Sequence, residues 1–321
     1  MNRQLTPAQS TPAIRPALDL DFPDPFVLAT AEGYFAFATN ARGLDVQVAF
    51  SPDLATWELR GNALAHLPPW ALRGFTWAPE VMAVDGGYVM YYVARHATSG
   101  LQCIGAAFST RPEGPYRDSS VEPLISQLEL GGAIDPSPFV EEDGSRYLLW
   151  KNDGNAIHKE TVIWARRLSD DGRELTGETT ALIRNDTDWE GNLVEAPFAY
   201  RHGGRYYLFY SAADYNASSY AVGYAVSEAL LGPYRKPASP SPILATSKQL
   251  AGPGGQCVVT DGHGTPWMVY HAWRPGAVGY PRGKRRMYVS RLTFPNGTPR
   301  VTLSEGPATR AASEDATLAP A

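Results

Sequence analysis

Apolar and polar residues alternate with a period of two in nearly every block of the chain, and turns with glycine precede runs rich in aromatic residues. This alternation is typical of half-buried β-strands, and no window of a dozen residues keeps the i, i+3, i+4, i+7 spacing of an amphipathic helix. The 30 glycines and 27 prolines, spread along 321 residues, also interrupt the chain too often for long helices. The pattern predicts an all-β protein with many short strands.

The glycine turn and its aromatic strand occur five times. The lead aromatic residues are 54, 59, 59 and 61 residues apart, and they are Tyr34, Tyr88, Tyr147, Tyr206 and Trp267. Each copy is typical of a hairpin turn that enters a strand, and a further strand follows each one. Repeats of this kind predict a five-bladed β-propeller with four-stranded blades around a central channel. A β-sandwich is the alternative, but it does not account for five copies in phase.

The repeat places the propeller at residues 18–303. Residues 1–17 carry three prolines, and residues 304–321 are rich in Ala, Ser, Thr, Glu and Pro, so both ends are predicted to be flexible. The start has no basic segment followed by an apolar core, as a signal peptide requires, and no apolar run approaches the roughly 18 residues that cross a bilayer. We therefore expect a soluble, cytoplasmic protein.

The composition favours a large core and a neutral ligand. Hydrophobic residues make up 44% of the chain and charged residues 19%, with 28 Lys and Arg against 33 Asp and Glu. The net charge of −5 argues against a nucleic-acid or membrane partner, whose binding needs a basic surface. Cys103 and Cys257 are too few for a disulfide scaffold and lack the spacing of a zinc site, so buried free thiols are expected. The sequence does not indicate the oligomeric state.

Four of the five repeats place an acid 8 to 12 residues before the lead aromatic, where the innermost strand is expected: Asp24, Glu80, Asp135 and Glu195. Radial symmetry would point these side chains at one axis. Several carboxyl groups around a channel suit glycoside hydrolysis, in which one carboxylic acid protonates the leaving oxygen and another carboxylate activates water. A cage for a cation is the alternative, but calcium prefers six to eight oxygens and no D-x-D-x-D-G loop is present.

Five motifs occur in the same order as in a known family: FPDPF at 22–26, TWAPE at 76–80, AIDPS at 133–137, VEAP at 194–197 and VYH at 269–271. In these motifs the sequence resembles the five-bladed propellers of glycoside hydrolase family 43, which include α-L-arabinofuranosidases, arabinanases and β-xylosidases. The resemblance implies that Asp24 is the general base and Glu195 the general acid. It also implies that Asp135 tunes and orients the acid, and that the anomeric carbon is inverted.

The resemblance extends to the lower part of the channel. It implies that His271 points into the channel beneath the site and holds a water or a structural calcium ion, while the chemistry itself needs no cofactor. A satisfied core histidine is the alternative. A matching arginine of the family reaches the substrate or the catalytic acids. In the basic cluster at 282–286 we assign this role to Arg286, with Arg285 as the other candidate.

Further residues beside the acids are candidates for substrate binding. Phe75 and Trp77, next to Glu80, are expected to form an apolar platform for a sugar ring, with packing between blades as the alternative. Glu80 itself is expected to face the substrate. Lys151 and Asn152, at the end of the strand after Asp135, could bind sugar hydroxyls, although strand ends are often simply solvated.

Two neighbouring positions bear on the substrate. Ala196 follows Glu195 where many members of the family have glycine, and this is similar to members that act from the chain ends of arabinan. Asp188 and Glu190 compete with Glu195 for the acid role, but they precede the inner-strand position. We expect release of terminal α-L-arabinofuranosyl residues from arabinan or arabino-oligosaccharides. A β-xylosidase acting on xylo-oligosaccharides and a non-catalytic carbohydrate-binding propeller are the alternatives.

Overall fold

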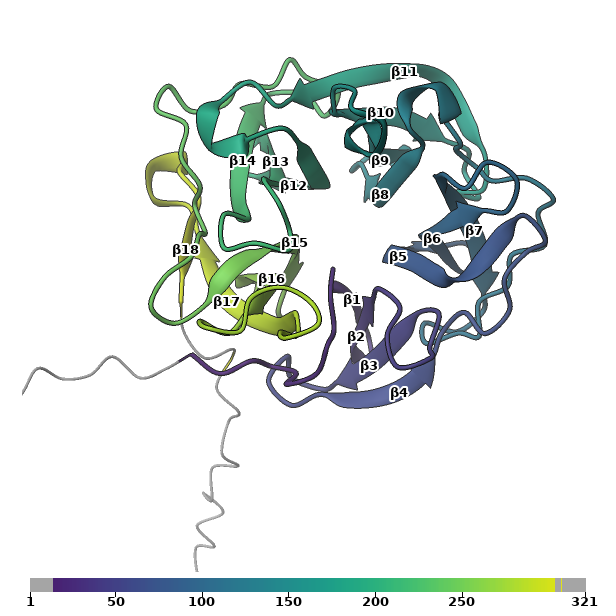
Figure 1. Ribbon diagram of the computed structural model, residues 1–321, viewed down its shortest axis with the longest axis horizontal. Helices are drawn as coiled ribbons and strands as arrows, with labels where there is room; N and C mark the ends of the chain where they lie inside the picture. The colour runs from purple at the N-terminus through teal and green to yellow at the C-terminus, as the bar shows by residue number, and fades with distance from the viewer. Residues whose placement is uncertain (1–13, 304–306, 308–321) are drawn as a thin grey trace, which may run out of the picture.

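Five β-sheets stand around a common axis in the computed structural model, which describes residues 14–303 and 307 (Figure 1). The predicted all-β, five-bladed propeller is therefore confirmed. The described residues contain no α-helix, and their 3₁₀ segments span Leu128–Leu130, Gly154–Ile157, Asp188–Glu190 and Pro295–Gly297. No helix in this part of the chain is long and apolar enough to span a membrane.

Within each blade, strands that follow one another in the chain pair antiparallel, and the first strand is the innermost (Figure 1). Blade 1 contains β1 (Phe26–Thr30), β2 (Gly33–Ala38), β3 (Gln47–Ser51) and β4 (Glu58–Asn62). Blade 2 contains β5 (Ala71–Val84), β6 (Gly87–His96) and β7 (Gln102–Ser109). Blade 3 contains β8 (Ala133–Val140), β9 (Arg146–Asn152), β10 (Val162–Leu168) and β11 (Leu175–Arg184). Blade 4 contains β12 (Val194–His202), β13 (Arg205–Ala212) and β14 (Ala221–Ser227). Blade 5 contains β15 (Ala251–Thr260), β16 (Pro266–Trp273), β17 (Arg286–Thr293) and β18 (Arg300–Thr302).

Blades 2 and 4 differ from the prediction of four strands in every blade. Their outermost strands, β7 and β14, have no regular fourth partner. Each is instead held at two isolated bridges, which are Phe108–Arg117 and Ile104–Ile125 in blade 2, and Val226–Arg235 and Val222–Leu244 in blade 4. These are the two blades that contain a Gly-Pro-Tyr segment, at 114–116 and 232–234. The chain there touches the sheet edge without forming a ladder.

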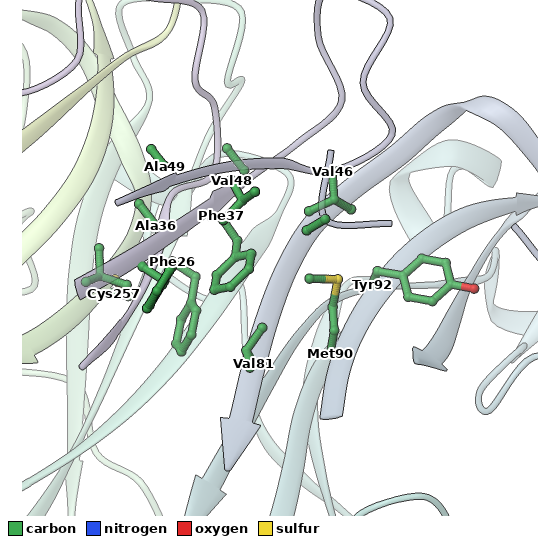
Figure 2. Close-up of a cluster of buried hydrophobic side chains, with 14 of the residues drawn as sticks. Phe26, Ala36, Phe37, Val46, Val48, Ala49, Val81, Met90, Tyr92 and Cys257 are labelled. Atoms are coloured by element: carbon green, nitrogen blue, oxygen red, sulfur yellow. The ribbon is translucent and has the colours of Figure 1, made fainter. Parts of the chain in front are cut away.

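The aromatic-rich runs form the second strands of the blades, which are buried on both faces because neighbouring blades cover them. Figure 2 shows one of these interfaces, where Phe26 and Phe37 of blade 1 approach Val81 and Met90 of blade 2. Phe37 and Met90 have no exposed surface. Burial of one such side chain contributes about 1.5–3 kcal/mol. The core therefore lies between the blades and leaves the axis to polar residues.

The chain segment before β1 closes the ring by pairing with blade 5. Leu18 forms an antiparallel bridge with Met287, and the Ala17 amide donates a hydrogen bond to the Met287 carbonyl (2.8 Å). The Phe22 amide bonds the Arg285 carbonyl in the same way (2.9 Å). Residues 1–13 and most of 304–321 lie outside the described residues, so the predicted flexible ends stay a prediction. Ile14, inside the predicted N-terminal arm, is buried.

Candidate active site

A cleft of about 930 Å³ opens where the inner strands begin, and residues of all five blades line it. The four acids predicted from the repeat all lie in this cleft: Asp24, Glu80, Asp135 and Glu195. Trp77 and Lys151 also line it, as the sequence had suggested. The structure thus brings together side chains from distant parts of the sequence in one place.

A left-handed residue marks the same position in each blade. The φ angles are 51°, 39°, 54°, 49° and 57° at Asp24, Ala78, Asp135, Ala196 and Gly255, and all five residues line the cleft. The register of β5, β8, β12 and β15 shifts at these points, as at a β-bulge. Positive φ is unfavourable for residues other than glycine, and such strain concentrates at functional sites. These kinks set the direction in which the acids leave the strands.

Asp24 is held as a carboxylate by residues of the first and last blades. Its Oδ1 accepts a hydrogen bond from Arg285 Nη1 (3.0 Å), and its Oδ2 accepts one from the Thr39 hydroxyl (2.6 Å). Burial acts to raise the pKa of Asp24, but the Arg285 charge and these hydrogen bonds outweigh it and lower the pKa below its ordinary value. Asp24 is therefore ionised at neutral pH and can accept a proton from water.

Asp135 and Glu195 form a carboxyl pair on blades 3 and 4. Asp135 Oδ2 accepts a hydrogen bond from the backbone amide of Ala196 (2.8 Å), the residue after Glu195. Burial first and the charge of Glu195 second raise the pKa of Asp135 to about 8, against the opposing charge of Lys151. Two neighbouring buried carboxyl groups resist losing both protons. The pair can therefore retain one proton near neutral pH.

Glu80 has a buried carboxyl oxygen, Oε2, without a hydrogen-bond partner among the described residues. Burial raises the pKa of Glu80 well above its ordinary value, the charge of Asp135 adds to this shift, and a hydrogen bond with Ser137 opposes it. The neutral form of Glu80 is favoured, and it can donate a hydrogen bond inside the cleft.

His271 supports Asp24 from below as a neutral imidazole. Burial first and the charge of Arg285 second lower the pKa of His271 to about 3. The Asp24 amide donates a hydrogen bond to Nδ1 (3.0 Å), so the ring proton lies on Nε2. Nε2 is buried without a partner, and a protonated nitrogen cannot ligate a metal. In the described chain, no group of three or more His, Cys, Asp or Glu side chains could hold a metal ion.

Comparison with protein families matches residues 14–299 to the family described as "Glycosyl hydrolases family 43". The chain belongs to glycosyl hydrolases family 43. The resemblance seen in the five motifs is thus confirmed, and the protein is a glycoside hydrolase.

Individual proteins agree with this family. The crystal structure of "a thermostable family-43 glycoside hydrolase" covers 93% of the chain, and the chain covers all of it, with a TM-score of 0.82 and 32% identity. "Beta-D-galactofuranosidase xynD" of Aspergillus niger is 27% identical over 84% of the chain and 79% of its own length. "Extracellular exo-alpha-(1->5)-L-arabinofuranosidase" of Streptomyces chartreusis is 29% identical over 78% and 79%. Other relatives are named as arabinanases and as xylosidase/arabinosidases.

Three substrate-binding assignments in this family 43 enzyme need correction. Arg286 bonds Asp19, and Arg285 is the arginine that lines the cleft and holds Asp24. Phe75 lies outside the residues that line the cleft. The central carbon of the Arg95 guanidinium lies over its ring, 3.6 Å from the ring centroid.

The third correction concerns Asn152, which is 2% exposed. It receives hydrogen bonds from the Val162 amide (2.8 Å) and from Trp164 Nε1 (3.1 Å), and it donates to the Leu130 and Glu160 carbonyls. Its side chain therefore holds the connection between β9 and β10 and has no group left for a sugar.

Some residues of the family 43 site could not be found in the sequence. The Tyr220 hydroxyl donates to Glu195 Oε1 (2.8 Å), and its ring stacks on His271 with centroids 5.8 Å apart. Gln256 Nε2 donates to the Ala196 carbonyl (2.8 Å) at the kink of blade 4. Tyr220 lies before β14, outside the inner-strand position of the repeat, and Gln256 follows the kink of blade 5, the one repeat without an acid there.

Arg285→Met should shift the acid limb of the pH–activity profile of this hydrolase to higher pH, by roughly 1–2 units. The guanidinium lowers the pKa of Asp24, so its loss raises that pKa, and the carboxylate is then protonated at a higher pH. Activity at acidic pH falls more than activity at neutral pH. Arg286→Met is the matched control and should leave the limb in place. Equal shifts in both variants would contradict the assignment.

Gly255→Ala should impair both the site and the fold. A Cβ there would lie 2.6 Å from His271 Nδ1 and 2.8 Å from Asp24 Oδ1, at a residue with φ of +57°. We expect a loss of about 1–3 kcal/mol in the free energy of unfolding and at least about tenfold in kcat. Gly262→Ala, in the β15–β16 turn with open space around it, is the control. Denaturant unfolding and initial rates measure the two effects, and wild-type values for Gly255→Ala would contradict the close packing.

Proposed function

We propose that this family 43 hydrolase releases terminal α-L-arabinofuranosyl residues from arabinan or arabino-oligosaccharides by single displacement with inversion. One observation carries the proposal: a single cleft contains a carboxylate kept ionised by Arg285 and a carboxyl pair that retains a proton. Inverting hydrolysis needs both states at once, one to activate water and one to protonate the leaving oxygen.

The roles follow from the surroundings of each acid. Asp24, with its lowered pKa, is the general base that takes a proton from the attacking water. Glu195 is the general acid. Asp135 is the positioning residue, because its hydrogen bond to the Ala196 amide fixes the strand that carries Glu195 and its charge helps the pair retain a proton. The chemistry needs no cofactor, since carboxyl groups move both protons.

The choice of an arabinofuranoside has two supports. The relatives from Streptomyces chartreusis and Aspergillus niger are both named for furanosides, an α-L-arabinofuranoside and a β-D-galactofuranoside. The sequence at Glu195-Ala196 is similar to family members that act from chain ends. Relatives named xylosidase/arabinosidase keep a β-xyloside as the second candidate.

The test compares nitrophenyl α-L-arabinofuranoside with nitrophenyl β-D-xyloside, and arabino-oligosaccharides with xylo-oligosaccharides. We expect faster release from the arabinosides and single arabinose units as the first product. Proton NMR at early times should show β-arabinose, because inversion reverses the anomeric configuration. Preference for xylosides would overturn the substrate, longer first products would overturn the chain-end action, and an α-anomer would overturn the single displacement.

A further inference from the structure

Both carboxylate oxygens of Glu195 have protein partners of different chemical kinds. Oε2 lies 3.1 Å from Lys151 Nζ of β9, and Oε1 accepts a hydrogen bond from the Tyr220 hydroxyl (2.8 Å). The Lys151 side chain has no exposed surface, and its second partner is Asp153 Oδ1 at 3.5 Å. Burial acts to lower the pKa of Lys151, but the charges of Glu195 and Asp153 outweigh it and raise the pKa, so the ammonium group persists.

The two partners differ in whether they can accept a hydrogen bond from a protonated carboxyl oxygen. An ammonium group only donates hydrogen bonds, so Oε2 beside Lys151 must remain an acceptor. A tyrosine hydroxyl both donates and accepts. When Oε1 is protonated, Tyr220 can accept that proton's hydrogen bond and turn its own hydrogen toward Ser211, with which it also interacts. Protonation is therefore favoured on Oε1, because a protonated Oε2 would be a weaker acceptor for the Lys151 ammonium group.

We propose that Lys151 is a positioning residue that keeps Oε2 of Glu195 unprotonated, so that the leaving-group proton is delivered from Oε1, with Tyr220 as its reversible partner. This inference rests on the proposed role of Glu195 as general acid. It changes the expected role of Lys151, because a buried ammonium group that already contacts two carboxylates acts on the acid and not on a sugar hydroxyl.

The charged and titratable groups around Glu195 come from three blades: Asp135, Lys151 and Asp153 of blade 3, Tyr220 before β14 of blade 4 and Asp24 before β1 of blade 1. Lys151 is the one cation among these groups. Its positive charge favours ionised carboxyl groups, whereas Asp135 and Asp24 favour protonated ones. Removing the cation and removing its Asp153 partner should therefore have opposite effects.

The experiment measures pH–rate profiles and the dependence on leaving group for Lys151→Met, with the glycoside that the wild type cleaves. We expect the alkaline limb to move up by about one pH unit, because the acid keeps its proton longer without the cation. The loss in kcat should be about 10²-fold on an oligosaccharide but under about threefold on a dinitrophenyl glycoside, whose leaving group needs no proton. Equal losses on both substrates with an unmoved limb would overturn the proposal.

Asp153→Asn keeps the lysine and provides a second, independent measurement should Lys151→Met fail to fold. Without Asp153 the ammonium charge acts more strongly on Glu195, so the alkaline limb should move to lower pH. A shift to higher pH, or no shift, would contradict the proposal. Failure of the proposed function appears separately, as a wild type that cleaves neither arabinosides nor xylosides.

Discussion

Replacing Asp24 by alanine should lower kcat on an arabino-oligosaccharide by about 10³-fold or more, and by a similar factor on a dinitrophenyl arabinofuranoside. The water must lose a proton in the displacement whatever the leaving group is, so a better leaving group cannot compensate for the missing base. Arg285 and Thr39 also lose their acceptor, which leaves a buried charge unpaired. Initial rates on both substrates over a range of pH test this expectation.

The control for Asp24→Ala is Asp170→Ala, which removes an exposed carboxylate from the β10–β11 turn of blade 3. Its rates should equal those of the wild type. Circular dichroism and the melting temperature show whether Asp24→Ala keeps its fold. A folded Asp24→Ala enzyme that retained a tenth of the wild-type rate would rule out Asp24 as the base.

Glu195→Ala is expected to lower kcat far more on an oligosaccharide than on a dinitrophenyl glycoside. On an oligosaccharide kcat should fall by about 10²–10⁴-fold, the range that a general acid supplies, because a sugar alkoxide leaves poorly without a proton. On a dinitrophenyl glycoside the loss should be under about tenfold, because that leaving group departs as a stable anion. The alkaline limb of the pH profile should also disappear on the activated substrate.

Asp188→Asn tests the acid that competes with Glu195 in the sequence. Asp188 is exposed and lies outside the residues that line the cleft, so the variant should show the wild-type ratio of rates on the two substrates. If Glu195→Ala lost activity equally on both substrates, Glu195 would have a binding or structural role and the acid would have to be sought elsewhere.

The blades and the positions of the acids could be predicted from the sequence, because both follow from a repeat. The lead aromatic of each copy is in the second strand of its blade, and counting back from Tyr34, Tyr147 and Tyr206 reaches Asp24, Asp135 and Glu195. Radial symmetry then brings these positions to one cleft, which needs no knowledge of individual contacts. The family follows from the motifs around them.

The errors fall where a single step along a strand changes the side that a residue faces. Lys151 and Asn152 are neighbours in β9, and successive side chains point to opposite faces, so only Lys151 reaches the cleft. Arg285, directly before β17, lines the cleft, whereas Arg286, the first residue of β17, does not. Composition and motifs cannot show which face of the strand a residue lies on, because this depends on the register of the strand in its sheet.

The left-handed backbone at Ala78 and Ala196 was also invisible in the sequence, since alanine rarely adopts it. The repeat did show a proline after four of the five kinks, but proline restricts the preceding residue to extended conformations in most settings. Tertiary packing around the axis overrides this local preference. The missing fourth strands of blades 2 and 4 have the same origin, because the edge of a blade is decided by long-range contacts.

The pairing of Leu18 with Met287 lies where blade 5 meets blade 1, at the joint between the two ends of the chain, and Asp24 lies beside this joint. Asp24 and Arg285 are 261 positions apart in the chain and meet because the two ends meet. Opening of this joint would separate them while the other blades keep their strands. On heating or in denaturant, the enzyme would then lose its activity before it loses its β-structure.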